Sequence, residues 1–286
     1  MKNIQGNFRG VGGMELYFQA WLPEGNPRAV LTIVHGAGDH TGRYERIVTP
    51  LVESGFACYG FDMRGYGRSG GRRGHIDAWS DYREDLKIFL NLVHSHLPGK
   101  PVFLFGFSLG ALVALEFVLR DARGLQGVIL SGTPIKPVGV AGPLKIMVAR
   151  ALSRWAPTFS IELVAAYESV TRDPAVIKGL RTDRLHHNRV TARWGTESMA
   201  SADWVRSRAA EIALPVLFIH GGADPLNLPG GVQRYYQQIT FADKEIRVYP
   251  DSRHETHGDL DYARVVADLR AWMAAHVPVT EYEAAA

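Results

Sequence analysis

One short segment constrains the fold of this chain more than any other, because it joins two apolar runs through a tight turn. The first run is Val102–Phe105, the turn is Gly106-Phe-Ser-Leu-Gly110, and the second run begins at Ala111. A Gly-x-Ser-x-Gly turn between a buried strand and a helix predicts a nucleophile elbow, with the serine raised at the end of a sheet. The two glycines allow strand and helix to pass close together. Ser108 is therefore the predicted nucleophile.

A serine needs a general base, and the base needs a group that orients it. In this kind of fold both follow the serine, in the order Ser, acid, His. The apolar run Leu214–His220 ends in a Gly-Gly-Ala-Asp loop that carries Asp224. The run Glu245–Pro250 is followed by a loop that carries His254. Since α/β sheets gather such loops at one edge, we predict Asp224 as the orienting carboxylate and His254 as the base.

Three other residues compete for these roles. His257 lies three residues beyond His254 and is the most plausible alternative base. Asp251 could replace Asp224, but it follows the same strand as His254. An acid from a separate loop is better placed to orient the imidazole ring. His35 also follows an apolar run, but it precedes the serine. Asp224 itself could be only a solvated turn residue.

Ester or amide chemistry at a serine also needs donors for the oxyanion. One is the main-chain N–H of the residue after the nucleophile, here Leu109, and the second comes from the loop after an early strand. The segment His35–His40 reads His-Gly-Ala-Gly-Asp-His. Its small residues let main-chain N–H groups approach a substrate carbonyl closely, so we predict Ala37 as the second donor.

These motifs together resemble the monoacylglycerol lipase/lysophospholipase-like branch (serine aminopeptidase-type hydrolases) of the α/β-hydrolase superfamily. The resemblance runs from about residue 14 to residue 276. Five segments carry it in the family's order: the oxyanion loop HGAGDHTGRY, the segment FDMRGYGRSGG, the elbow GFSLG, the loop GGAD and the segment YPDSRH. It implies triad roles for Ser108, Asp224 and His254, oxyanion roles for Ala37 and Leu109, and no metal or organic cofactor.

The chain departs from that branch at the residue before the nucleophile. This residue is often His in the branch and is Phe107 here. We expect the Phe107 side chain to pack behind the elbow and leave the triad intact. The substitution weakens any argument for one particular substrate.

Composition excludes several classes of protein. With 286 residues, 46% hydrophobic and 21% charged, the chain fits one large globular domain with an insertion. We find no apolar run of about 20 residues that would span a bilayer and no signal-peptide core at the start. A single cysteine, Cys58, allows no intrachain disulfide, so we expect a cytoplasmic location. The small net charge of +3 and the absence of a recognisable module argue against a nucleic-acid partner.

Apolar runs alternate with helical patterns along most of the chain, which predicts an α/β fold with a mostly parallel sheet and helices on both faces. An edge hairpin is expected from Gly6–Gly10 and Met14–Leu22. The predicted strands and helices are: strands 29–35, 57–61, 102–106, 127–131, 214–220 and 245–250; helices 43–54, 79–97, 109–120, 231–239 and 260–275.

The alternation stops between about Pro134 and Arg208, where helical patterns occur without a convincing buried strand. We therefore predict a hydrolase core of residues 1–133 and 209–286, with residues 134–208 as a helical lid. The apolar, cation-bearing stretch Val138–Trp155 would line an acyl tunnel, touch a lipid surface as a peripheral contact, or simply pack on the core. His186, His187 and Asn188 would contact a polar head group or lie on the surface.

The resemblance implies a serine ester hydrolase that acts on a small-molecule ester, a monoacylglycerol or a lysophospholipid. Peripheral association with a membrane through the lid is a further expectation. A carboxylesterase for short or non-lipid esters is the alternative, separated by acyl-chain preference. A non-catalytic binding member of the fold is a third reading, against which an intact Ser108, Asp224 and His254 argue. Fold alone does not decide among these functions.

Overall fold

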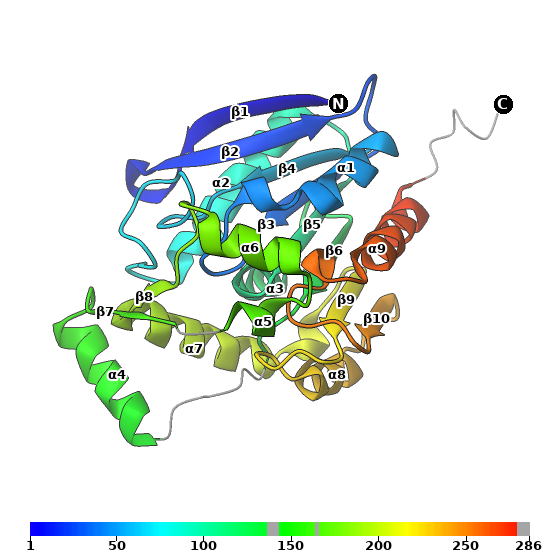
Figure 1. Cartoon of the computed structure of the whole chain (residues 1–286). Helices are drawn as coiled ribbons and strands as arrows, with labels where there is room; N and C mark the ends of the chain where they lie inside the picture. The colour runs from blue at the N-terminus through cyan, green and yellow to red at the C-terminus, as the bar shows by residue number, and fades with distance from the viewer. Residues whose placement is uncertain (136–142, 164–165, 279–286) are drawn as a thin grey trace.

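A computed structural model describes residues 1–135, 143–163 and 166–278, and it contains one eight-stranded sheet (Figure 1). The strand order is β1-β2-β4-β3-β5-β6-β9-β10, with β1–β2 and β2–β4 antiparallel and the other pairs parallel. The predicted mostly parallel sheet is confirmed. The strands are β1 (Lys2–Arg9), β2 (Glu15–Leu22), β3 (Val30–Val34), β4 (Ala57–Phe61), β5 (Val102–Phe107), β6 (Gly127–Ser131), β9 (Val216–Gly221) and β10 (Lys244–Tyr249).

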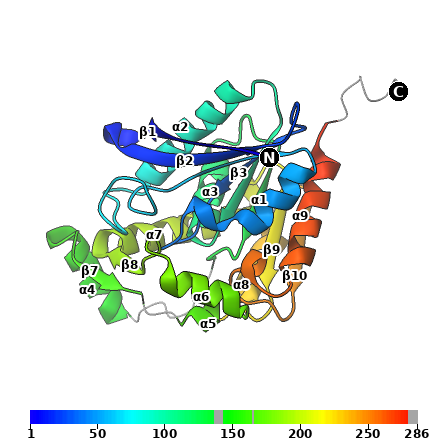
Figure 2. The same cartoon turned by 45° about the horizontal axis from the view of Figure 1, so that its top comes forward.

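Helices cover both faces of the sheet, as the alternation of strands and helices predicts (Figures 1 and 2). Successive side chains of a strand point to opposite faces, and β5 shows the result. Phe103, Phe105 and Phe107 pack in the core under α1 and α9, whereas Val102 and Leu104 pack in the core under α2, α3 and α8. These helices are α1 (Glu45–Glu53), α2 (Ser80–His96), α3 (Leu109–Arg120), α8 (Pro229–Gln238) and α9 (Tyr262–His276).

The amino-terminal hairpin is longer than predicted. Its first strand pairs with β2 from Lys2 opposite Leu22 to Arg9 opposite Glu15, whereas the sequence suggested only residues 6–10. The reason is exposure: β1 is an edge strand, and most of its residues are solvent-exposed or half-buried. It therefore lacks the apolar alternation by which a strand is found in a sequence.

The described residues between β6 and β9 add no strand to the sheet, and we call the elements from α4 to α7 the insertion. A two-stranded antiparallel pair, β7–β8, forms inside it and was not predicted, because β7 is exposed and each strand has only three residues. Residues 138–142 of the predicted amphipathic stretch lie outside the described residues. The elements are α4 (Pro143–Trp155), β7 (Ser160–Glu162), α5 (Tyr167–Val170), α6 (Pro174–Thr182), β8 (Arg189–Thr191) and α7 (Ala192–Arg206). Short 3₁₀ helices lie elsewhere: η1 (Val11–Gly13), η2 (Thr41–Arg43), η3 (Ala209–Glu211) and η4 (Thr256–Gly258).

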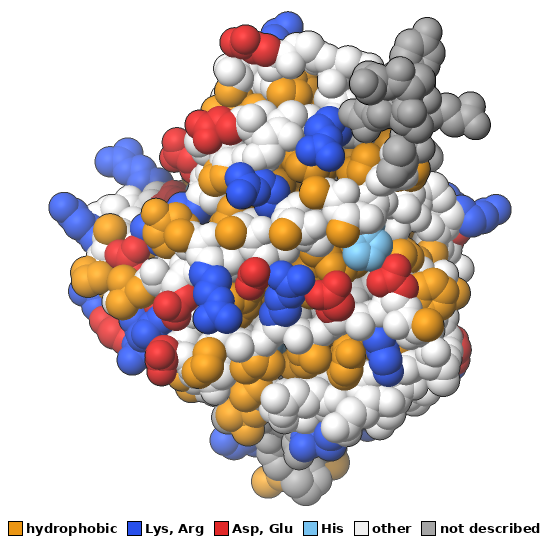
Figure 3. Space-filling model, turned by 90° about the vertical axis from the view of Figure 1, so that its right-hand side faces the viewer, with side chains coloured by type: hydrophobic (Ala, Val, Ile, Leu, Met, Phe, Trp, Pro, Cys, Tyr) orange, Lys and Arg blue, Asp and Glu red, His pale blue; other side chains and the backbone are white. Residues whose placement is uncertain are grey.

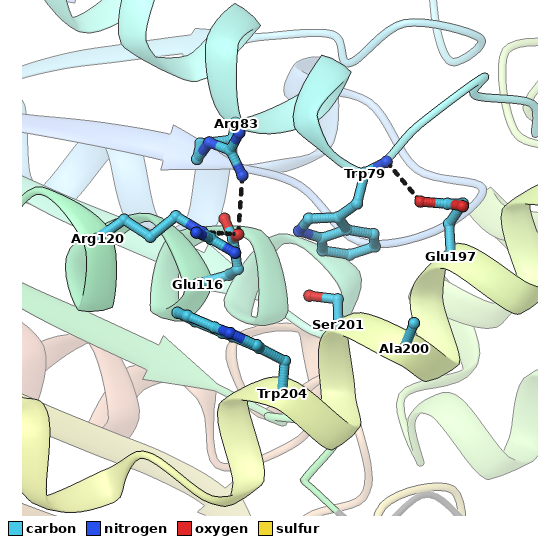
Figure 4. Close-up of a pocket in the computed structure, with 8 residues that line it drawn as sticks. All are labelled: Trp79, Arg83, Glu116, Arg120, Glu197, Ala200, Ser201 and Trp204. Atoms are coloured by element: carbon cyan, nitrogen blue, oxygen red, sulfur yellow. Dashed lines mark hydrogen bonds and ion pairs between the residues drawn. The ribbon is translucent and has the colours of Figure 1, made fainter.

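The last helix of the insertion, α7, is docked on the core beside α2 and α3 (Figure 4). The Trp79 main-chain N–H donates to the Glu197 carboxylate at 2.9 Å. The Arg120 guanidinium lies over the Trp204 ring, 4.1 Å from its centroid. The hydrogen bond thus joins α7 to the start of α2, and the cation–π contact joins it to α3, the helix that begins beside Ser108.

The surface agrees with a small net charge. On the face in Figure 3, basic and acidic side chains are interspersed, so the described residues of this face form no continuous basic surface of the kind that nucleic acids need. None of the helices among residues 1–135, 143–163 and 166–278 has the length and apolar character needed to cross a membrane.

We expect Trp272→Ala to lower the free energy of unfolding by about 3–5 kcal/mol, because it leaves a cavity in the core. Trp272 is 2% exposed and meets the Phe103 ring edge-on at 5.9 Å. Trp155→Ala is the matched control, since Trp155 is 80% exposed. Urea unfolding measures both. Equal midpoints for the two variants would contradict the core described for α9.

Candidate active site

Ser108 lies on the turn between β5 and α3 in a backbone conformation that few residues adopt. Its φ is 52° and its ψ is −114°, and it is the one non-glycine residue with positive φ in the described part of the chain. Such a conformation costs about 1–3 kcal/mol and persists only where the surroundings enforce it. Here the Ser108 N–H donates to Ser131 O at 2.9 Å, and the Leu112 N–H donates to Ser108 O at 3.1 Å. Strain of this kind is typical of functional sites.

The prediction that the two elbow glycines permit a close crossing is confirmed. A Cβ atom on Gly106 would lie 2.4 Å from Gly110 O, and one on Gly110 would lie 2.1 Å from Val34 O. Both distances are impossible for real atoms. Glycine at these two positions is therefore a steric requirement of the turn that carries Ser108.

The structure brings together the three residues predicted as the triad. His254 Nδ1 lies 2.8 Å from Asp224 Oδ2, and His254 Nε2 lies 2.9 Å from Ser108 Oγ. With the Nδ1–H donated to the carboxylate, Nε2 is left to accept the Ser108 hydroxyl proton. Asp224 and His254 are buried, while Ser108 is partly exposed. This chain of hydrogen bonds can activate a serine hydroxyl that a substrate is able to reach.

The Asp224 carboxylate is held ionised by its neighbours. Burial by itself raises its pKa, but the hydrogen bond and charge of His254 and the Asn227 N–H outweigh burial and hold the pKa below its usual value. The second oxygen, Oδ1, accepts from the N–H groups of Leu226 and Asn227 at 2.8 and 3.0 Å. A buried charge needs such partners to be tolerated.

Two supporting residues escaped the sequence analysis. The Asn227 side chain donates to Gly132 O at 2.8 Å, which ties the Asp224 loop to the end of β6. Gly132 has a φ of 59°, and a Cβ there would lie 3.1 Å from His254 O and 3.2 Å from His254 Cε1. The only signal was their position just after predicted strands, which many residues share.

The competing residues have other surroundings. His257 is buried and stacks on Tyr44 at 5.2 Å, and desolvation lowers the pKa of its imidazole. Asp251 is exposed, and its carboxylate makes no hydrogen bond to His254 among the described residues. His35 Nε2 accepts from the Met63 N–H at 2.8 Å. Each therefore serves a structural contact or faces solvent.

Phe107 packs behind the elbow, as predicted. Its ring lies 5.1 Å from the His254 ring and 4.9 Å from the His257 ring. It also fills the space beside Gly36, where a Cβ would lie 2.9 Å from Phe107 Cδ1. The ring thus forms an apolar wall beside the His254 imidazole, and the hydrogen bonds among the three predicted triad residues are kept.

The two N–H groups predicted as oxyanion donors lie on segments that meet at Ser108. Leu109 is the first residue of α3, and a Cβ on Gly36, next to Ala37, would lie 3.5 Å from Ser108 Cβ. Within the described residues, neither the Ala37 N–H nor the Leu109 N–H has a protein acceptor. Both are free to receive a ligand oxygen. The helix dipole of α3 adds partial positive charge at the same place.

The family described as serine aminopeptidase, S33 (Hydrolase_4) matches residues 25–261, and the chain belongs to it. A monoacylglycerol lipase from Mycolicibacterium smegmatis is 28% identical over 272 residues, which cover 95% of this chain and 97% of that protein. Phospholipase YtpA from Bacillus subtilis is 25% identical over 248 residues, covering 86% and 95%. The crystal structure of a Paleococcus ferrophilus monoacylglycerol lipase superimposes with a TM-score of 0.84 at 27% identity, covering 92% of this chain and all of that one. The fold is thus that of the α/β-hydrolases, and the chain resembles monoacylglycerol lipases.

Asp224→Asn is expected to slow the reaction of Ser108 with a fluorophosphonate by about 10⁴-fold, because an amide cannot hold the productive tautomer of His254. Labelling rates measured by mass spectrometry test this. Asp251→Asn is the control, since it removes an exposed carboxylate from the neighbouring loop. Equal rates for the two variants would show that Asp224 does not orient the base.

Proposed function

We propose that this protein is a serine carboxylic-ester hydrolase that works through an acyl-serine intermediate. The observation that carries the proposal is the hydrogen-bonded chain Ser108–His254–Asp224, with the serine held at positive φ at the start of α3. The name of a similar protein, monoacylglycerol lipase, supports ester hydrolysis, and the family description, serine aminopeptidase, supports a serine nucleophile.

In the proposed reaction, Ser108 Oγ attacks the ester carbonyl carbon while His254 Nε2 takes the hydroxyl proton. Asp224 stabilises the imidazolium, and the N–H groups of Ala37 and Leu109 hold the oxyanion. His254 then gives its proton to the leaving alcohol, which completes the acyl-serine. Water attacks the acyl group by the same route, and Ser108 recovers its proton. These steps require only groups of this chain and water.

We further propose a monoacylglycerol or lysophospholipid as the substrate. Support comes from similar proteins named monoacylglycerol lipase and phospholipase, which match most of this chain's length. Both substrate classes join one acyl chain to a polar alcohol by an ester bond. We also propose that residues 134–208 form a lid over a core of residues 1–133 and 209–286.

An exposed apolar stripe on α4 supports a lipid-facing role for that lid. Leu144, Met147, Val148 and Trp155 are all exposed and recur at the spacing of one helix face. The opposite side of α4 packs on α7, where Ser153 and Thr196 share a hydrogen bond of 2.7 Å. In Figure 1 the helix lies at the margin of the molecule, away from the sheet. We propose that this stripe makes peripheral contact with a lipid surface.

The substrate proposal is tested by fatty-acid release from monoacylglycerols of increasing chain length and from matched p-nitrophenyl esters. We expect medium or long monoacylglycerols to be preferred, and Ser108→Ala to lose about six orders of magnitude in rate. Turnover of short p-nitrophenyl esters alone would replace the lipid substrate with a short-chain ester. Equal inactivity of wild type and Ser108→Ala on every ester would refute the triad.

The lipid contact is tested by sedimentation with vesicles of equal parts phosphatidylglycerol and phosphatidylcholine. We expect Leu144→Ser/Met147→Ser/Trp155→Ser to weaken binding more than tenfold, since each buried apolar side chain contributes about 1.5–3 kcal/mol. Leu260→Ser is the control, because Leu260 is an exposed apolar residue outside the insertion. Unchanged binding of the triple variant would refute the contact.

A further inference from the structure

The loop that carries the predicted oxyanion donor, residues 35–40, is fastened to the core on one side. The Met63 N–H donates to His35 Nε2 at 2.8 Å. The Asp39 carboxylate accepts from Tyr44 Oη at 3.0 Å and from Arg43 Nη1 at 3.1 Å. These contacts fix both ends of the loop. The middle of the loop, around Gly38, has a different partner.

That partner is the insertion segment just after α6. The His187 N–H donates to Gly38 O at 3.2 Å, and His40 Nε2–H donates to Asp183 Oδ2 at 2.7 Å. The approach is so close that a Cβ on Gly38 would lie 2.4 Å from His187 O. Two hydrogen bonds and a tight backbone contact therefore join the insertion to the loop that carries Ala37.

His187 is itself anchored to a second core loop. Its Nε2–H donates to Gly65 O at 3.0 Å, and its ring lies parallel to that of Tyr66, with centroids 5.0 Å apart. Its Nδ1 accepts from the Arg189 N–H at 3.3 Å. Both ring nitrogens are thus occupied, so His187 does not have a nitrogen free for a substrate head group. The contacts of the His187 side chain therefore hold this part of the insertion against the core.

The other flank of α6 holds the loop that carries the base. Thr171 Oγ1 donates to Gly258 O at 2.8 Å, and the Glu255 N–H donates to Val170 O at 2.8 Å. The helix therefore runs from the histidine loop to the oxyanion loop as a brace across the carboxyl edge of the sheet (Figure 1). The insertion fixes the relative position of the two loops that must act on one tetrahedral centre.

We propose that Asp183 and His187 are positioning residues, which act through the 35–40 loop to hold the Ala37 N–H where the oxyanion forms. The proposal rests on the proposed ester hydrolysis. A displacement of about 1 Å can cost a hundredfold in rate, and loss of one oxyanion donor costs about 10²–10³-fold. The insertion then contributes to the chemical step as well as to covering the site.

The test uses the full chain and a short, soluble p-nitrophenyl ester, so that lipid contact plays no part. For Asp183→Ala, His187→Ala and the double variant we expect kcat to fall about tenfold or more, with KM within twofold of wild type. The affinity for an alkyl boronic acid, which forms a tetrahedral adduct on Ser108, should fall in proportion to kcat/KM. Asp183→Asn keeps a hydrogen-bonding oxygen and should restore most of the activity.

Asp203→Ala is the matched control, because Asp203 forms an exposed ion pair with Arg206 on α7 and touches neither loop. It should match wild type in every readout. Unchanged boronic acid affinity in folded Asp183 and His187 variants would overturn the positioning role while leaving the hydrolase proposal intact. If Asp183→Ala does not fold, His187→Ala decides the matter by the same comparison of boronic acid affinity with kcat/KM. A wild type that hydrolyses no ester would refute the hydrolase proposal, and the positioning role with it.

Discussion

The close crossing of β5 and α3 at Ser108 is the contact on which the rest of the site depends. Because Gly110 has no side chain, α3 begins against the carbonyl of Val34 at the end of β3. The loop after β3, which carries Ala37, therefore lies next to Ser108. The strain at Ser108 persists because β5 is paired on both edges, with β3 and β6, and cannot relax.

A second constraint is the burial of the Asp224 charge. A carboxylate out of water is costly unless it is paired and hydrogen-bonded, and here His254 and two main-chain N–H groups supply the partners. The Asn227 side chain donates to Gly132 O and so connects the Asp224 loop to the end of β6. The hydrogen bonds that stabilise the Asp224 charge also fix the orientation of the His254 imidazole. The same contacts therefore make the buried charge tolerable and align the base.

Local patterns predicted the elements whose side chains are buried on a sheet or helix face. The apolar run before Ser108 and the glycines around it predict β5, the elbow and α3, and all three are present. The same reasoning failed for β7 and β8, since short exposed strands carry no apolar pattern. It also overlooked Asn227 and Gly132, because their partners lie 95 and 122 residues away in sequence. Asp183 escaped for the same reason, as its partner His40 is 143 residues distant.

By itself, the sequence determined the alternating α/β architecture, the elbow at Ser108 and the loops that carry Asp224, His254 and Ala37, because turn chemistry and apolar periodicity are properties of neighbouring residues. Only the tertiary structure decided which histidine meets the serine and which aspartate meets that histidine. His254 and His257 are three residues apart, yet one ring contacts Ser108 Oγ and the other stacks on Tyr44. The tertiary structure also decided that the insertion is hydrogen-bonded to the 35–40 loop. Such choices depend on how distant segments pack, and no local pattern encodes the distance between them.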